Sequence, residues 1–312
     1  MFKILELFGG IGACSKALEK LGIDYEIADY VEIDKYAVKS FNAIHNTNFE
    51  PQDITIWDKD IEVDLIMHGS PCQDFSLAGK QAGGDKDSGT RSSLMYETIR
   101  IVEKLKPTYV VWENVKNLLS KKHRHNFDAY LEAMEQLGYK NYYQVLNAKD
   151  YGIPQNRERV FTISILGDES FEFPEKQELK LKLKDMLEVS NFIIDNFDRE
   201  IKVKDIKEYT NFYIVPRGSD GKLINGSYNR VWKTDKYVGA LNLTKITEIG
   251  EIAQEKLKIR KLTPKECWRL MGFDDEDYEK ASQVNSNTQL YKQSGNSIVV
   301  NVLEAIFKEL IK

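Results

Sequence analysis

The sequence is poor in the residues that mark several classes of protein. Its 312 residues include only three cysteines, Cys14, Cys72 and Cys267, which lie far apart and form no CxxC pair. This spacing argues against a disulfide framework and against zinc, so we expect no metal site. No apolar run approaches the roughly 20 residues that span a bilayer, and the N-terminus lacks a signal-peptide layout. We therefore expect a cytoplasmic protein without a membrane partner.

Positive charge is slightly outnumbered, with 44 Lys and Arg against 49 Asp and Glu. The net charge of −5, taken alone, argues against a nucleic-acid-binding protein. The average hides an asymmetry, because residues 1–100 hold 10 Lys and Arg against 17 Asp and Glu, whereas residues 201–270 hold 15 against 8. The asymmetry predicts two surfaces with different partners, although charge runs also occur on ordinary solvated faces.

The first half of the chain alternates between apolar runs and helical patterns. Strand-like runs cover residues 2–8, 25–33, 63–69, 108–114, 142–148 and 159–166. The alternation predicts an open α/β sheet with helices on both faces. After residue 167 the sequence becomes charged and irregular. We expect one domain from residues 1–167 and 287–312, and a second, smaller domain from residues 168–286.

A glycine-rich turn in ELFGGIGACSKAL (residues 6–18) lies between a strand and a helix, as in nucleotide sites. The pattern alone fits an ordinary tight turn equally well. Glu32 ends the second strand about 20 residues later, where an acid can accept hydrogen bonds from a ribose. Asp53 is suited to an adenine amino group. Since no basic residue stands beside the turn, a cationic, phosphate-free adenosine cofactor such as S-adenosylmethionine fits better than NAD.

Polar residues also follow other predicted strands. Cys72 lies in GSPCQDFSLAGK, where a buried strand gives way to a polar loop. Functional residues concentrate at such places, but a buried structural cysteine is the alternative. Glu113 follows the apolar VVW, where a carboxyl group can hold a proton; an ordinary acid at a helix start is the alternative. Arg157 and Arg159 stand two apart, so both are expected on one face, within reach of a phosphate or base.

Eight segments, in order, resemble the motifs of the cytosine-C5 DNA methyltransferase family of bacterial or phage type. They are LFGGIG, VEIDKYA, DIT, SPCQDFS, ENV, QNRER, RKLTPKECWRLMGF and GNSIVV. Two departures are visible: Glu6 stands where aspartate is commoner, and Gly9 where alanine or serine is usual. The resemblance implies a Rossmann-like S-adenosylmethionine-dependent methyltransferase sheet, with residues 168–286 as a smaller target-recognition domain.

The resemblance also implies a site for S-adenosylmethionine, which leaves as S-adenosylhomocysteine. Phe8 and the glycines would line its methionine end, Glu32 would bind the ribose, and Ile33 would lie against the adenine. Asp53 would take the adenine amino group, and Asn296 with its neighbour would close the pocket from the C-terminus. The implied cofactor-binding set is Phe8, Gly10, Gly12, Glu32, Ile33, Asp53, Ile54, Pro71, Asn296 and Ser297.

The same resemblance implies the catalytic roles. Cys72 would be the nucleophile, because a thiolate that adds to carbon 6 of cytosine makes carbon 5 nucleophilic. Glu113 would stabilise the charge that builds on the ring, and Arg157 and Arg159 would steady the target nucleotide. The base must be flipped out of duplex DNA. The residues expected to contact DNA are Gln73, Ser76, Arg91, Arg217, Arg230 and Lys233.

We therefore expect a DNA (cytosine-5-)-methyltransferase that acts on double-stranded DNA as a monomer in the bacterial cytoplasm or nucleoid. It would work beside a cognate restriction endonuclease that acts independently, or as a stand-alone modifier. One alternative is a tRNA cytosine-5 methyltransferase, since a tRNA-methylating branch shares PCQ and ENV. A second is a non-catalytic DNA-binding protein, which would need neither Cys72 nor Glu113. A nicotinamide dehydrogenase is a weaker alternative, because its phosphate fingerprint is missing.

Overall fold

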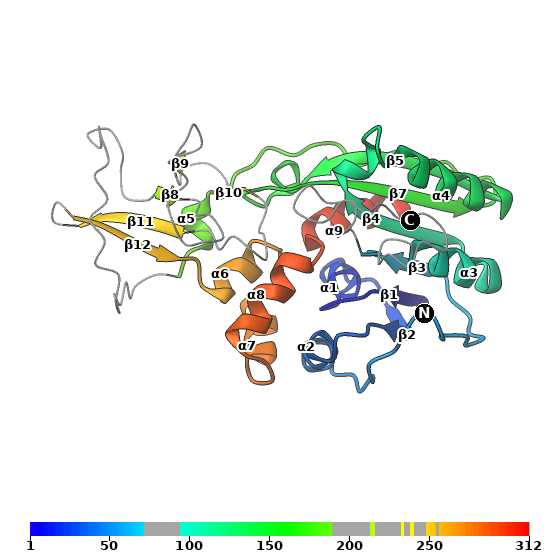
Figure 1. Cartoon of the computed structure of the whole chain (residues 1–312), viewed down its shortest axis with the longest axis horizontal. Coiled ribbons are helices and arrows are strands. Elements are labelled where there is room, and N and C mark those ends of the chain that lie inside the picture. The colour runs from blue at the N-terminus through cyan, green and yellow to red at the C-terminus, as the bar shows by residue number, and fades with distance from the viewer. Residues whose placement is uncertain are drawn as a thin grey trace.

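The computed structural model describes residues 1–71, 94–188, 213–215, 232–233, 238–239, 248–253 and 256–311. Its main element is a six-stranded sheet in the order β2-β1-β3-β4-β7-β5 (Figure 1). The strands are β1 (Phe2–Leu7), β2 (Tyr25–Val31), β3 (Leu65–His68), β4 (Tyr109–Val115), β5 (Tyr139–Asn147) and β7 (Glu158–Leu166). The first four in this order are parallel, and β7 runs antiparallel to both β4 and β5. The carboxyl ends of the four parallel strands therefore meet at one edge.

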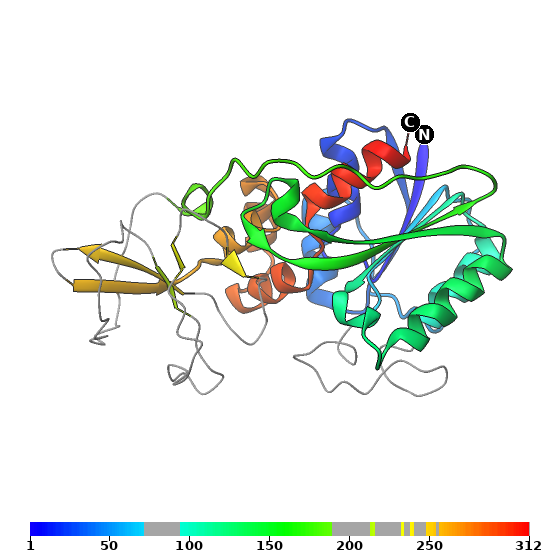
Figure 2. The same ribbon diagram turned by 90° about the horizontal axis from the view of Figure 1, so that it is seen from above.

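Helices cover both faces of this sheet. Alternate residues of β1 face opposite sides, so that Ile4 packs with helices α1 and α9, whereas Leu5 packs on the side of α3 and α4. Figure 2 shows α9 (red) and α4 (teal) on opposite sides. The helices are α1 (Ala13–Lys20), α2 (Lys35–His45), α3 (Met95–Leu105), α4 (Arg124–Gln136) and α9 (Val300–Leu310). This layering confirms the expected α/β fold class.

Three further helices lead to the C-terminus: α6 (Pro264–Arg269), α7 (Asp275–Ser282) and α8 (Asn287–Asn296). Helix α6 begins at a capping box, in which Thr263 Oγ1 accepts from the Glu266 amide and Glu266 Oε2 accepts from the Thr263 amide. Helix α8 docks on α2, because the Ser40 hydroxyl donates to Gln293 Oε1 at 3.0 Å. The docking holds the C-terminal end of α8 beside the main sheet.

A second sheet, with strand order β12-β11-β8-β9, lies away from the main sheet (Figure 1, left). Its strands are β8 (Tyr213–Val215), β9 (Trp232–Lys233), β11 (Glu248–Ala253) and β12 (Lys256–Lys261), and all its pairings are antiparallel. A short parallel pairing joins β10 (Val238–Gly239) to β6 (Gln155–Asn156). Strand β6 comes just before β7 of the main sheet in the sequence. Within the part of the chain that the structure describes, no helix is both long and apolar enough to cross a bilayer.

Both ends of the expected recognition domain contribute to the core of the main domain. Leu183 of the short helix α5 (Leu183–Met186) and Trp268 of α6 are buried in the same hydrophobic cluster as Ile4 and Leu303. The second sheet thus extends from a base that is packed against the main sheet. The domain boundaries at residues 167 and 286 stay a prediction.

Candidate active site

The glycine-rich turn connects β1 to α1 at the carboxyl edge of the sheet. Phe8 adopts a φ of 54°, a left-handed conformation that bulky residues rarely adopt, and Gly10 follows with a φ of 57°. A Cβ on Gly10 would meet no described atom within 4 Å, so this residue has open space beside it. A Cβ on Gly12 would lie 2.2 Å from His45 Nε2. The glycine at position 12 therefore allows α2 to approach the turn closely.

Glu32 follows β2 and holds the turn from the side. Its Oε2 accepts a hydrogen bond from the Gly10 amide at 3.2 Å, and its Oε1 accepts one from the Asp34 amide at 2.8 Å. Burial raises the pKa of Glu32, while these backbone hydrogen bonds lower it. The neighbouring Ile33 is 68% exposed and offers an apolar surface next to this carboxyl group. Two of the residues expected at the ribose and the adenine therefore lie side by side.

The segment after β2 carries Asp53 and Ile54. The Gln52 amide donates to the Glu32 carbonyl at 2.9 Å, which ties this segment to the end of β2. Asp53 Oδ1 accepts from the Thr55 amide at 2.9 Å and from its hydroxyl at 2.8 Å. Ile54 is buried in the core on the α3 side. Ile54 is thus a core residue. The contacts of Asp53 and Ile54 with a cofactor stay predictions.

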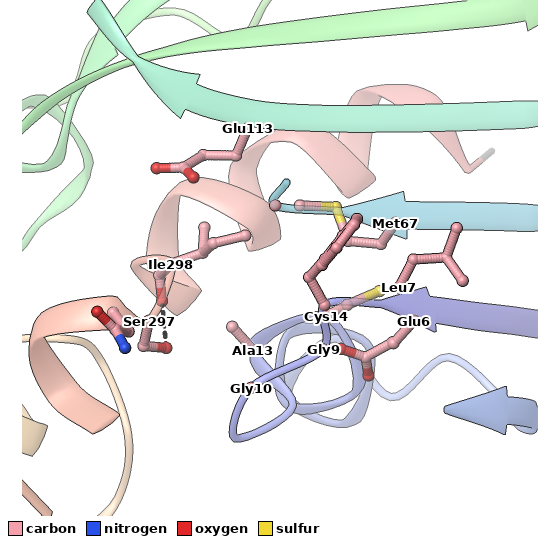
Figure 3. Close-up of a pocket in the computed structure, with 13 residues that line it drawn as sticks. Glu6, Leu7, Gly9, Gly10, Ala13, Cys14, Met67, Glu113, Ser297 and Ile298 are labelled. Atoms are coloured by element: carbon pink, nitrogen blue, oxygen red, sulfur yellow. Dashed lines mark hydrogen bonds between the residues drawn. The ribbon is translucent and has the colours of Figure 1, made fainter. Parts of the chain in front are cut away.

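A pocket with about 420 Å³ of empty volume, part of it open to solvent, lies between β1, β3, β4 and the end of α8 (Figure 3). The lining residues are Glu6, Leu7, Phe8, Gly9, Gly10, Ala13, Cys14, Met67, Gly69, Glu113, Asn296, Ser297 and Ile298. Five of the expected residues thus share one pocket, namely Phe8, Gly10, Glu113, Asn296 and Ser297. Gly12, Glu32 and Asp53 lie outside this lining.

Glu6 lines the pocket but was not among the expected binding residues. It is buried in β1, and its Oε1 accepts from both the amide and the hydroxyl of Ser15 near the start of α1. Burial raises the pKa of Glu6 to about 7, against the opposing effect of the hydrogen bonds from Ser15. The sequence signal was its place in the glycine motif, where an acid is usual. Met67, Gly69 and Ile298 also line the pocket and carry no comparable signal in the sequence.

The side chain of Glu113 extends from β4 on the side of the pocket that lies opposite the glycine turn (Figure 3). Its Oε1 lies 3.0 Å from Arg159 Nε of the adjacent strand β7, an ion pair between two largely buried groups. In the register of these strands Arg159 stands opposite Val115, two residues beyond Glu113. The antiparallel pairing therefore brings together two of the expected catalytic residues.

Arg157 makes different contacts from Arg159. It is buried, and its Nη2 donates to the Ser297 carbonyl at 2.8 Å and, with Nη1, to the Gly295 carbonyl at 3.4 Å. Arg159 lies in β7, whereas Arg157 directly precedes this strand, which begins at Glu158; the expectation that both guanidinium groups reach the target nucleotide stays a prediction. Arg157 therefore stabilises the segment from Gly295 to Ser297, which borders the pocket.

The end of β3 is anchored beside Glu113. Trp112 Nε1 donates to Ser70 Oγ at 3.0 Å, and Asn114 Nδ2 donates to the Ser70 carbonyl at 3.3 Å. A Cβ on Gly69 would lie 3.9 Å from Glu113 Oε2. The chain therefore passes close to Glu113 immediately before Pro71 and Cys72.

Several expected site residues lie outside the described residues. They are Cys72, Gln73, Ser76, Arg91, Arg217 and Arg230, and only the backbone of Lys233 is described. Pro71 is the last described residue before this gap, and its contact with a cofactor stays a prediction. Within the described ranges, no three His, Cys, Asp or Glu side chains are grouped so that they could hold a metal ion.

The mixed α/β sheet carries a glycine turn after β1 and an acid after β2, both at the carboxyl edge of its parallel strands; this is the arrangement of Rossmann-like folds that bind a cofactor containing adenosine. Residues 2–312 match the model of the C-5 cytosine-specific DNA methylase family. The chain belongs to this family, which confirms the expected resemblance, the cofactor and methylation at carbon 5 of cytosine in DNA.

Relatives of full length support this assignment. The chain is 37% identical to the type II methyltransferase M2.ScrFI of Lactococcus lactis subsp. cremoris, over 100% of this chain and 99% of the relative. It is 31% identical to the orphan methyltransferase M.SPRI of Bacillus phage SPR, over 99% and 97%. Its fold is similar to that of a putative DNA modification methyltransferase from an Escherichia coli prophage, with a TM-score of 0.70, 20% identity and coverage of 99% and 98%.

Proposed function

We propose that this chain methylates carbon 5 of a cytosine that it flips out of double-stranded DNA, with Cys72 as the nucleophile. The observation that carries the proposal is the pocket, in which the glycine turn, Glu113 and Ser297 border one space. Gly69 borders the same space and lies three residues before Cys72. The groups expected to hold the cofactor and those expected to act on the base therefore belong to one edge of the sheet.

The residues present fit a cationic adenosine cofactor. The described residues that line the pocket include Glu6 and Glu113 but no lysine or arginine. Such a lining suits a sulfonium cation better than a phosphate. We assign the open side of Gly10 to the methionine end, Glu32 to the ribose and the exposed face of Ile33 to the adenine. S-adenosylmethionine, when bound, supplies the methyl group.

The chemistry on the base is assigned to Cys72 and Glu113. The thiolate of Cys72 forms a bond to carbon 6, and the electron pair of the carbon 5–carbon 6 double bond becomes available at carbon 5. Glu113 shares a proton with ring N3 and stabilises the charge on the ring. After carbon 5 is methylated, its proton leaves to a base, the double bond forms again, and the bond to sulfur breaks. The thiolate is thereby regenerated.

The two arginines support different parts of the site. Arg159 Nε forms an ion pair with the Glu113 carboxyl group at 3.0 Å, and we assign to Arg159 the task of steadying the target nucleotide. Arg157, through its hydrogen bonds to the Gly295 and Ser297 carbonyls, fixes the segment that borders the cofactor side. We therefore assign a positioning role to Arg157. The base-reading residues are expected in the second sheet and its connections, around Arg217, Arg230 and Lys233.

A transfer RNA is the competing substrate, and a non-catalytic DNA-binding protein is the competing activity. The chain is incubated with tritiated S-adenosylmethionine and either duplex DNA or tRNA, beside the variant Cys72→Ser. We expect label in DNA that disappears in Cys72→Ser. Label in tRNA alone would show that the substrate is tRNA and not DNA. DNA binding without label would show that the chain is a non-catalytic DNA-binding protein.

We further propose that the chain acts on DNA as a monomer and needs no endonuclease for activity. The names of its relatives include both type II and orphan methyltransferases, so both settings occur in the family. Bisulfite sequencing of genomic DNA from a host that expresses this chain alone should show methylated cytosines in one short sequence. Sedimentation of the active protein should give a mass near 36.1 kDa. Methylation that requires a second protein would contradict this proposal.

A further inference from the structure

Tyr30 fills the space in which a side chain at position 9 would stand. Tyr30 is fully buried in β2, and its ring stacks on Phe41 of α2 with centroids 3.8 Å apart. A Cβ built on Gly9 would lie 2.6 Å from Tyr30 Cε2 and 2.8 Å from Cδ2, distances that real Cβ atoms do not show. Because the ring is held between β2 and α2, it cannot move aside without disturbing the core.

The hydroxyl group of Tyr30 also holds the turn directly. It donates to the Gly10 carbonyl at 2.6 Å, while Glu32, two residues further along, accepts from the Gly10 amide at 3.2 Å. Two side chains at the end of β2 therefore form hydrogen bonds with the peptide groups on both sides of Gly10. Gly10 has open space beside it and lines the pocket together with Phe8 and Gly9. The position of these pocket-lining atoms consequently depends on Tyr30.

We propose that Tyr30 is a positioning residue for the cofactor and that Gly9 and Tyr30 form a matched pair. The proposal rests on the assignment of the glycine turn to S-adenosylmethionine. Gly9 does not belong to the glycines with positive φ, so its backbone conformation is open to any residue. The penalty for alanine at position 9 therefore comes from contact with the Tyr30 ring and, at 3.1 Å, with Glu6 Cβ.

The expected consequence is a loss of cofactor affinity rather than of chemistry. In Gly9→Ala the turn must move away from β2, which displaces Phe8 and the Gly10 peptide. We expect about a tenfold weaker binding of S-adenosylmethionine, a coupling of the size that contacting residues show. In Tyr30→Phe the ring stays and only the hydrogen bond to Gly10 is lost, so we expect about a fivefold loss. The KM for the cofactor should rise, with turnover at saturating cofactor changed much less.

The experiment measures the dissociation constant of S-adenosylmethionine by titration calorimetry on the full chain. The variants are Gly9→Ala, Tyr30→Phe, Tyr30→Val and the double variant of Gly9→Ala with Tyr30→Val. Valine is chosen because it lacks both ring carbons that crowd position 9 and suits a strand. Tyr139→Phe is the matched control for Tyr30→Phe. Tyr139 is also buried, and its hydroxyl donates to the Pro107 carbonyl at 2.7 Å, in a part of the sheet remote from the pocket. Urea unfolding reports the stability of each variant.

The proposal predicts a specific pattern. Gly9→Ala should weaken binding about tenfold in the natural background and less than about twofold in the Tyr30→Val background. Tyr139→Phe should lose stability but bind the cofactor normally. Equal losses from Gly9→Ala in both backgrounds, or unchanged affinity in Gly9→Ala and Tyr30→Phe, would overturn the matched pair. A natural chain that binds no S-adenosylmethionine at all would instead refute the proposed function.

Discussion

The variant Ser70→Ala tests whether the segment before Cys72 must be anchored for catalysis. Ser70 is 3% exposed, and its Oγ accepts from the indole nitrogen of Trp112, which is 1% exposed. With alanine at position 70, the indole N–H loses its acceptor in a space closed to water. An unpaired buried donor costs about 1–3 kcal/mol, and we expect the free energy of unfolding to fall by about this amount.

The effect on turnover should exceed what lost stability alone produces. Ser70 lies two residues before Cys72, and Trp112 directly precedes Glu113, so we expect their hydrogen bond to hold the proposed nucleophile close to the proposed acid. Small misplacements of reacting groups cost large factors in rate, and we expect kcat to fall about tenfold. Apart from Pro71, the residues assigned to the cofactor lie on other segments of the chain. The KM for S-adenosylmethionine should therefore change by less than about twofold.

The direct assay is the rate at which a covalent adduct forms with duplex DNA that contains 5-fluorocytosine. Ser164→Ala is the matched control, because Ser164 is also buried in the sheet and its hydroxyl donates to Asn141 Oδ1 at 2.6 Å. We expect slow adduct formation in Ser70→Ala and a normal rate in Ser164→Ala at similar stability. A normal rate in Ser70→Ala, or an equal loss in both variants, would refute the anchoring argument.

Three further predictions concern the described residues. Glu113→Gln should bind DNA and cofactor normally, while kcat falls about 10²-fold or more in steady-state kinetics; near-normal turnover would remove its role. Arg157→Met should raise the KM for the cofactor about tenfold with little change in kcat, since charged hydrogen bonds to two carbonyls are lost. Burial lowers the pKa of His68 to about 3 from 6.5, so the unfolded chain binds a proton that the folded chain does not, and stability falls with pH below 6.5. Urea unfolding at pH 7 and at pH 4.5 measures how much stability each chain loses on acidification. Below pH 6.5 the natural chain should lose about 1 kcal/mol more per pH unit than His68→Phe; equal losses in the two chains would contradict this.

Most strands of the main sheet could be predicted because each of them follows from a local pattern. The apolar runs expected at residues 2–8, 63–69 and 108–114 contain the parallel strands β1, β3 and most of β4, and turn residues or helices follow each strand. Such patterns are visible in sequence since strands buried on both faces are apolar throughout. The same reasoning placed Glu32 and Glu113 at strand ends that meet at one edge of the sheet.

The positions of the two arginines could not be predicted from spacing alone. A separation of two residues implies one face only if both residues belong to a strand. Arg157 lies in the link between β6 and β7, and its guanidinium group turns to carbonyls that are 138 and 140 residues later in the chain. Ile54 is buried in the core, and its expected contact with a cofactor stays a prediction.

The two departures from the family pattern are explained by contacts that only the fold brings together. Glu6 reaches from β1 to the amide and the hydroxyl of Ser15, so its length is used to bind the start of α1. Gly9 leaves room for the ring of Tyr30, whose hydroxyl binds the Gly10 carbonyl. A residue that looks exchangeable in the glycine motif is thus tied to a neighbour in β2. It follows that alanine at position 9 should be tolerated only in chains with a smaller side chain at position 30.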